Sequence, residues 1–360
     1  MTAEDARRVA NRTTTLSDLL AQCREMTGSD NLFVVSHDLK SLHRLDSHDE
    51  TLSDPGLLNT LLTGEPAIFN GDTYIAFPDH SFPLLVARNP STQPSTSVHA
   101  AMAGTALSHN RLVFDKIEQL RRPDNMSVAA QLQWDQLPVR CALLDTFHIA
   151  ATLEPAASVA GDMYDIAMTP SGVATMLSMD AMGHGVSATL AASLALAAIR
   201  NTRRAGGSMA AQAEAADRAL IEEYDGDIFV TMALIELTPD RIAVVNAGHE
   251  PARLGSTTEG FATLDIPADP PLGLDGPTSY HVHTLGPLLS GQRLCLLSDG
   301  ASESRNQRGD FLGDEGVNAT LLRYASTHPL LAAHKIGQSV LDYCGELNDD
   351  LTVMIACTSP

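Results

Sequence analysis

The chain has few cysteines, little positive charge and no long apolar run. Its five cysteines are isolated from one another, at Cys23, Cys141, Cys295, Cys344 and Cys357. Without a Cys-x-x-Cys pair they predict neither a zinc site nor a disulfide framework, and reduced thiols are the simpler interpretation. No apolar stretch approaches the roughly 18 residues of a membrane-spanning helix, and residues 1–15 lack the apolar segment of a secretory signal. These absences favour a cytoplasmic protein.

Positive charge is scarce because 23 Lys and Arg residues stand against 44 Asp and Glu residues, for a formal net charge of −21 at pH 7. This balance argues against a nucleic-acid partner, which needs a basic surface, and against anionic membranes. The sequence also has no G-x-S-x-G nucleophile motif and no phosphate-binding P-loop. The acidic excess leaves two interpretations open: a solubilising surface, or a carboxylate-rich site that a cation neutralises.

The pattern of apolar residues predicts two domains within the 360 residues. Helical and strand patterns alternate up to about residue 120, where a long helix is interrupted at Pro123. A second helical piece ends at Pro138. From about Arg140 onward, short apolar runs bounded by turn residues predict strands, with helices inserted between them. We therefore predict an α+β fold in which sheets are packed with helices outside them.

Several aspartates lie where an apolar run ends or begins. Asp180 and Asp299 follow apolar runs, Asp162 comes after the first run, and the pair Asp349–Asp350 precedes the last one. A short acidic side chain there is held by a rigid strand and can face a cleft, although each one alone also fits ordinary turn chemistry. If they converge, their repulsion requires a cation. Hard carboxylate oxygens suit Mg²⁺ or Mn²⁺.

Five sequence blocks contain these aspartates and follow one another in a fixed order. They are SVAGDMYDI, MDAMGHGVSATL, FVTMALIELTPDRIAVVNAGHEPARL, LLSDGASESRNQRGDFLGDEGV and NDDLTVMIA. Together, residues 140 to 358 resemble the bacterial branch of the metal-dependent (PPM, type 2C) serine/threonine phosphatases, typified by the sporulation stage II E protein and the sigma-B regulator phosphatases. Ala160, Met163 and Met182 depart from the family pattern, but every expected carboxylate is present.

The resemblance implies a site for two Mn²⁺ or Mg²⁺ ions in a β-sandwich flanked by helices. The implied metal ligands are the side chains of Asp162, Asp180, Asp299 and Asp349 and the backbone carbonyl of Ala181. The implied catalytic residues among them are Asp162, Asp180 and Asp299. Asp350 is the alternative to Asp349.

Four further residues lie near these ligands in the sequence, and the sequence only suggests their roles or leaves them open. Gly183 and Gly185 are expected to let the chain turn tightly from Asp180 into the next helix. His184, between them, is either an acid–base group or part of the turn. Asp165 is a candidate for a supporting role behind the metal ligands.

The N-terminal segments LAQCREMTGSDNLFVV, LLTGEPAIFN and AAMAGTALSHNRLVFDKI resemble parts of a GAF domain, a small-ligand sensor fold. We therefore expect a GAF-like α/β domain over residues 12–120, a helical linker over 121–139 and the phosphatase domain over 140–360. In the long helix, a three-and-four spacing predicts either pairing of two chains or packing on its own domain. The residues with this spacing are Ala103, Ala106, Asn110, Val113, Ile117 and Leu120.

The predicted function is that of a metal-dependent protein serine/threonine phosphatase in a partner-switching pathway. The resemblance alone implies its substrate, a phosphorylated anti-sigma-factor antagonist of the STAS type. A homodimer through the linker helix is possible in this scheme, and no nucleic acid or membrane is expected as a partner. Two alternatives stay open: a catalytically inactive binding protein with a phosphatase fold, and a hydrolase of small phosphoesters.

Overall fold

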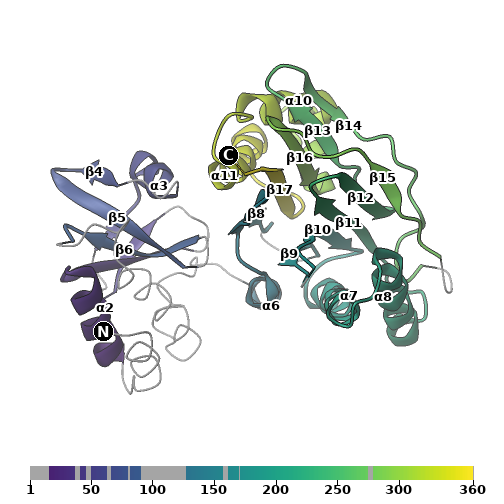
Figure 1. Ribbon diagram of the computed structural model, residues 1–360, viewed down its shortest axis with the longest axis horizontal. Helices are drawn as coiled ribbons and strands as arrows, with labels where there is room; N and C mark the ends of the chain where they lie inside the picture. The colour runs from purple at the N-terminus through teal and green to yellow at the C-terminus, as the bar shows by residue number, and fades with distance from the viewer. Residues whose placement is uncertain are drawn as a thin grey trace. The chain divides into compact units, whose positions relative to one another are not determined.

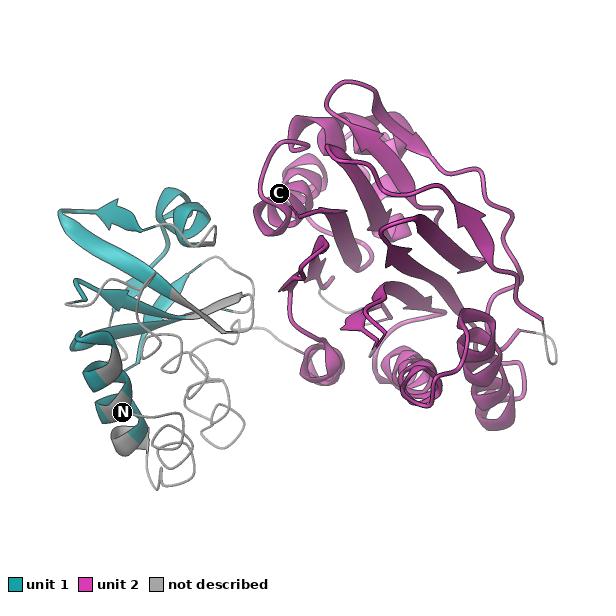
Figure 2. Cartoon of the chain, in the orientation of Figure 1, with its two compact units in different colours: residues 1–125 teal, residues 126–360 magenta. Residues whose placement is uncertain are grey.

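The computed structural model describes residues 16–36, 41–45, 50–62, 66–79, 82–90, 127–156, 161–169, 171–274 and 279–359. The chain divides into two compact units, Met1–Asn125 (unit 1) and Met126–Pro360 (unit 2), which are coloured separately in Figure 2. The boundaries predicted at residues 120 and 139 stay predictions. The spaced residues between 103 and 120 lie outside the described part of the chain. Among the helices described, none is long and apolar enough to cross a membrane.

Unit 1 is built on one antiparallel sheet with the strand order β3-β2-β1-β6-β5-β4. Its strands are β1 (Asn31–Val35), β2 (Leu42–Arg44), β3 (Thr51–Leu52), β4 (Ala67–Phe69), β5 (Asp72–Asp79) and β6 (Phe82–Arg88). Its described helices are α2 (Leu16–Thr27) and α3 (Pro55–Leu62), seen with the sheet in Figure 1. The GAF-like character of this unit stays a prediction.

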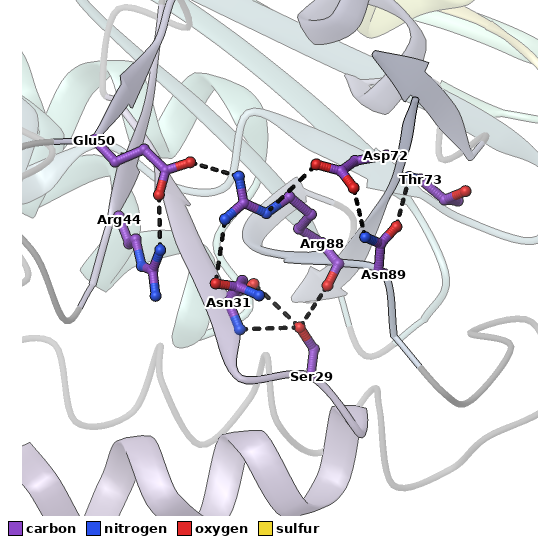
Figure 3. A network of polar contacts seen from close by, with 8 residues as sticks. All are labelled: Ser29, Asn31, Arg44, Glu50, Asp72, Thr73, Arg88 and Asn89. Atoms are coloured by element: carbon purple, nitrogen blue, oxygen red, sulfur yellow. Dashed lines mark hydrogen bonds and ion pairs between the residues drawn. The ribbon is translucent and has the colours of Figure 1, made fainter. Parts of the chain in front are cut away.

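A polar network joins the strands of unit 1 (Figure 3). Arg88, the last residue of β6, contacts Glu50 Oε1 at 2.5 Å and donates to Asn31 Oδ1 at 3.2 Å. Glu50 also accepts a hydrogen bond from Arg44 at 2.8 Å, and the Arg88 guanidinium lies 5.5 Å from the centre of the Phe33 ring. Burial alone would raise the pKa of Glu50, but the bonds from the two arginines outweigh burial and lower it. The network therefore connects β1, β2 and β6 through charged side chains that are only partly exposed.

Unit 2 contains two antiparallel sheets. The five-stranded sheet has the order β15-β12-β11-β10-β9, and the six-stranded sheet has the order β14-β13-β16-β17-β8-β7. The strands of the first are β9 (Met163–Met168), β10 (Ala174–Ala181), β11 (Val230–Thr238), β12 (Arg241–Ala247) and β15 (His283–Leu285). The strands of the second are β7 (Cys141–Leu143), β8 (Phe147–Glu154), β13 (Arg253–Ser256), β14 (Gly260–Thr263), β16 (Gln292–Leu297) and β17 (Leu351–Thr358).

The two sheets pack face to face, and helices cover their outer faces. The shared core contains side chains from both sheets, among them Ile149, Tyr164, Ile235, Leu294 and Met354. The helices are α6 (Val128–Gln136), α7 (Val186–Arg204), α8 (Met209–Tyr224), α9 (Asp299–Ser302), α10 (Gly313–Arg323) and α11 (Pro329–Cys344). α7 and α8 pack on the five-stranded sheet, and α10 and α11 on the six-stranded sheet (Figure 1). The predicted β-sandwich flanked by helices is thus confirmed for this unit.

Candidate functional site

The candidate site lies where strands of the two sheets of unit 2 end near one another. The five-stranded sheet supplies Asp162, which directly precedes β9, and Asp180, near the end of β10. The six-stranded sheet supplies Asp299, which begins α9 after β16, and the pair Asp349 and Asp350, which directly precedes β17. We call these five residues the carboxylate cluster.

Strand pairing explains why Asp162 and Asp180 share one face of their sheet. β9 and β10 are antiparallel with Met163 opposite Met179, so the adjoining positions Asp162 and Asp180 also lie opposite each other. Side chains alternate between the two faces along a strand. Tyr164, two positions after Asp162, packs in the core between the sheets. Both aspartates therefore point toward the six-stranded sheet.

Two glycines allow the backbone segments of the cluster to approach each other closely. A Cβ at Gly161 would lie 2.8 Å from the Ala181 carbonyl oxygen and 2.9 Å from Asp180 Oδ1. A Cβ at Gly300 would lie 2.1 Å from the Asp350 carbonyl oxygen. Real Cβ atoms essentially never approach other atoms within 3.0 Å. Glycine is therefore required at both positions for this arrangement of carboxylates.

Hydrogen bonds connect the two sheets at the cluster. Thr352 Oγ1 donates to Asp162 Oδ2 at 2.6 Å, and the Asp162 amide donates to Asp350 Oδ2 at 3.3 Å. Ser298 Oγ donates to the Asp350 carbonyl at 3.2 Å and accepts from the Thr352 amide at 2.9 Å. These bonds join segments that are far apart in the sequence, so they hold Asp162 in place beside β17.

The electrostatics of the cluster show that its carboxylates are close together. The pKa of Asp180 is raised to about 8, first by burial and then by the carboxylates of the six-stranded sheet, Asp299, Asp349 and Asp350. Burial, followed by Asp180 and Asp350, raises the pKa of Asp162 well above its ordinary value. Like charges in a poorly solvated space disfavour ionisation. A divalent cation would reverse this preference, because it stabilises the ionised carboxylates.

The structure favours Asp349 over Asp350 as an available ligand. Asp350 is 1% exposed, and its carboxylate accepts from the Ala156 amide at 2.9 Å and from Gln133 Nε2 at 2.9 Å, besides the Asp162 amide. Asp349 is exposed, and its Oδ1 accepts from the amide of Asp350 at 2.8 Å. Asp350 thus anchors the backbone of neighbouring segments, while Asp349 keeps a carboxylate oxygen accessible to a ligand.

Gln133 on α6 connects the helix that opens unit 2 to the carboxylate cluster. Its Nε2 donates to the Asp162 carbonyl at 2.6 Å and to Asp350 Oδ2 at 2.9 Å, and the side chain is 0% exposed. α6 begins at a side-chain cap, because Ser127 Oγ accepts from the Ala130 amide. The sequence indicated this helix but not the role of the glutamine. The one available signal in the sequence is that the segment AAQLQWDQLP resembles the short helix that precedes the domain in the phosphatase branch named above.

His249, in the N-A-G-H block, is a second residue that the sequence did not single out. It is 6% exposed, with Nε2 2.9 Å from Ser178 Oγ and Nδ1 2.9 Å from Thr231 Oγ1. Thr231 Oγ1 in turn lies 3.4 Å from the Asp180 carbonyl, to which it donates. Burial lowers the pKa of His249 to about 4. A neutral imidazole thus joins β10 to β11 beside the aspartate at the end of β10.

Asp165 does not join the carboxylate cluster. It is an odd number of residues from Asp162, so it points to the opposite face of the sheet, beneath α7. There it is 2% exposed and forms ion pairs with Arg200 at 2.7 Å and Arg203 at 2.9 Å. Arg200 also donates to the Gln136 carbonyl at 3.0 Å. The two arginines therefore hold α6, α7 and β9 together.

The turn after Asp180 needs its glycines, as the sequence predicted. Gly183 has φ +92° and Gly185 has φ +76°, in the left-handed region that favours glycine. Gly185 is also the residue from which α7 starts. His184 is exposed, and among the described residues its side chain makes no hydrogen bond that would hold it toward the cluster. The geometry therefore favours the turn interpretation of this histidine.

The donor set of the cluster fits a hard divalent cation. Its side chains are carboxylates, Asp180 and Asp299 are partly exposed, and Asp349 is exposed, so oxygen atoms are accessible from solvent. Over the part of the chain that the structure describes, no group of three or more His, Cys, Asp or Glu side chains is already arranged to hold a metal ion. The carboxylates nevertheless lie close enough to perturb one another's ionisation.

Comparison with known proteins confirms the family resemblance of unit 2. The family description of stage II sporulation protein E (SpoIIE) matches residues 170–359, more than half of the chain. No curated protein sequence matches the chain. The family match lies entirely within unit 2.

Three solved structures share the fold. The RsbU and RsbW domains of a Mycobacterium tuberculosis protein match with 23% identity and a TM-score of 0.52, over 61% of this chain and 62% of that one. The SiaA-PP2C domain of Pseudomonas aeruginosa matches with 23% identity and a TM-score of 0.50, over 59% and 85%. The PP2C phosphatase domain of SpoIIE from Bacillus subtilis, with a fragment of its regulatory domain, matches with 17% identity and a TM-score of 0.51, over 60% and 65%.

Proposed function

Because the chain belongs to the SpoIIE family of PP2C-type phosphatases, we propose that unit 2 is a metal-dependent phosphatase acting on phosphoserine or phosphothreonine in a signalling protein. The observation that carries this proposal is the carboxylate cluster itself. Strand ends from two different sheets bring together several aspartates, and burial together with the neighbouring carboxylates raises the pKa of Asp180 to about 8. A solvated acidic surface would not bury its carboxylates beside one another in this way.

In this proposal Asp162, Asp180, Asp299 and Asp349, with the carbonyl of Ala181, hold two Mn²⁺ or Mg²⁺ ions. When bound, the ions supply a hydroxide from a coordinated water and neutralise the phosphoryl oxygens. The residues around the ions have different structural roles. Thr352 orients Asp162 through the bond to Oδ2, while Gly161 and Gly300 allow the carboxylates to approach.

The test combines metal binding with turnover. Wild-type protein should hydrolyse p-nitrophenyl phosphate with Mn²⁺ and lose this activity in EDTA. Asp180→Asn and Asp299→Asn should each abolish turnover while circular dichroism shows an unchanged fold. Mn²⁺ should also raise the melting temperature, because a ligand that binds only the folded state stabilises it. A melting temperature that does not respond to millimolar Mn²⁺, together with turnover in either variant, would refute the proposal.

The substrate is proposed as a phosphorylated anti-sigma-factor antagonist of the STAS type. The support is the similarity of fold to the RsbU-containing protein and to SpoIIE. A panel of phosphorylated STAS proteins from the same genome, compared with small phosphoesters at equal concentration, separates a protein phosphatase from a general phosphoesterase. Preference for the small phosphoesters would contradict the proposed substrate.

The alternative function is that of a phosphatase-fold protein which binds a phosphorylated partner without hydrolysing it. Calorimetric titration with Mn²⁺ distinguishes the two functions. An inactive protein would bind the phosphorylated partner equally well with Mn²⁺ and with EDTA, whereas the enzyme would bind Mn²⁺ and turn the partner over.

Unit 1 and the linker are proposed to control this activity, with unit 1 as a GAF-like sensor and the linker helix pairing two chains. What supports this proposal is that α6 lies within the predicted linker, residues 121–139, and contacts the cluster through Gln133. Full-length protein and a chain starting at Met126, which keeps α6 and Gln133, should differ in activity and, by light scattering, in association state. Equal turnover and a monomeric full-length chain would exclude both parts.

A further inference from the structure

A second group of chemically active side chains lies on the six-stranded sheet, at the end away from the carboxylate cluster. β17 begins beside Asp350 and reaches Cys357 seven positions later, which corresponds to roughly 20 Å along an extended strand. There His148 on β8 is opposite Cys357, and Cys357 is opposite Arg293 on β16. Residues opposite one another on adjacent strands project from the same face. These three side chains therefore form a row, which we call the His–Cys–Arg row.

The row lies on the face covered by helices and not in the core between the sheets. Cys295 and Ile355, two positions from Arg293 and Cys357, pack in the cluster that includes α11 residues such as Ile336. Because side chains alternate along a strand, the row is on this same outer face. Arg293 Nη2 donates to the Thr327 carbonyl, which directly precedes the first turn of α11. The row therefore lies at the N-terminal end of α11.

The N-cap residue of α11, His328, makes no side-chain cap hydrogen bond. The helix has 16 residues, and among the described residues no side chain accepts a hydrogen bond from its first amides. Pro329 at the first position has no amide hydrogen, which leaves those of Leu330 and Leu331 directed out of the first turn. The positive end of the helix dipole is located here. An anion is the ligand that such an end prefers.

Two polar side chains at this end have nitrogen atoms without a hydrogen-bond partner in the described part of the protein. Arg293 is 8% exposed, and its Nη1 is buried without a hydrogen bond in the described part of the protein. Nδ1 of the half-buried His328 is likewise buried without a bond among the described residues. Burial lowers the pKa of His328, and the nearby side chains of His148 and Arg293 lower it further. The three side chains therefore lie near one another. A buried guanidinium nitrogen without a hydrogen-bond acceptor lowers the stability of the fold, unless a bound ligand supplies the acceptor.

We propose that the His–Cys–Arg row and the first turn of α11 form a binding site for a small oxyanion of the phosphate type. The Arg293 guanidinium would supply a charged, directional donor through Nη1. The amides of Leu330 and Leu331 and the imidazoles of His148 and His328 would complete the donors. No carboxylate appears in the row or in the helix turn above it. The site is separate from the carboxylate cluster and is a candidate regulatory site for free phosphate.

The test measures binding of inorganic phosphate to the full-length protein in EDTA. Without metal ions the carboxylate cluster repels anions, so binding there does not interfere. Isothermal titration at constant ionic strength, with chloride as the reference salt, should show phosphate binding to wild type. Arg293→Met should weaken it about ten-fold or more, the effect of losing one charged hydrogen bond. Arg308→Met, which removes the same charge from an exposed loop, should bind as wild type.

Two further measurements test the proposal even if Arg293→Met does not fold. His328→Ala and His148→Gln, both at half-buried positions, should each weaken phosphate binding. In wild type, phosphate should slow alkylation of Cys357 but not of Cys344, which is likewise half-buried and serves as the internal control. The proposal is overturned if phosphate does not bind wild type, if these variants bind as wild type does, or if both cysteines are protected alike.

Discussion

Replacing Gln133 by alanine should weaken the attachment of both Asp162 and Asp350 within the carboxylate cluster. The side chain is fully buried and makes hydrogen bonds of 2.6 Å to the Asp162 carbonyl and 2.9 Å to the Asp350 carboxylate. A bond to a charged acceptor contributes about 1.5–3 kcal/mol and a neutral one about 1 kcal/mol. Gln133→Ala should therefore lower the free energy of unfolding of unit 2 by roughly 2–4 kcal/mol.

The assay is urea unfolding followed by tryptophan fluorescence. Trp134 is the only tryptophan of the chain, lies next to Gln133 on α6 and is 9% exposed, so its emission reports whether α6 stays docked. Gln131→Ala is the matched control. This residue is on the same helix, but its side chain bonds only to exposed Asp135, and its loss should cost no more than about 0.5 kcal/mol. If both variants unfold at the same urea concentration, the assigned role of Gln133 is wrong.

Other predictions concern backbone approach, titration and a buried ion pair. Gly300→Ala places a Cβ 2.1 Å from a backbone oxygen before β17 and should cost about 3 kcal/mol or more in thermal unfolding. Gly286→Ala, with nothing within 4 Å, should be tolerated. Burial lowers the pKa of His249 to about 4, so its neutral form is favoured on folding, and stability should fall as pH drops from about 6.5 to 4. His249→Gln should flatten this dependence in urea titrations at several pH values. Arg200→Met should cost about 3 kcal/mol, and adding Asp165→Asn should cost less than the sum of the two changes in a double-mutant cycle.

Local sequence patterns were enough to predict the strand-ending aspartates, the glycine turn after Asp180 and the strand and helix segments of unit 2. The sandwich with outer helices followed from the family resemblance. Apolar runs of strand length set the strands of unit 2, and positive φ angles at Gly183 and Gly185 require residues without a Cβ. The order of five motifs then indicated the family, which the match over residues 170–359 confirmed.

Which of these residues meet depends on how the sheets and helices pack. Asp165 and Asp162 are equally acidic and three residues apart, yet strand alternation directs Asp165 to two arginines of α7 and Asp162 to the opposite sheet. Asp350 differs from Asp349 because Gln133, from another part of the chain, occupies its carboxylate. Register between distant strands and helix docking set these contacts, and neither is encoded in the spacing of residues along the chain.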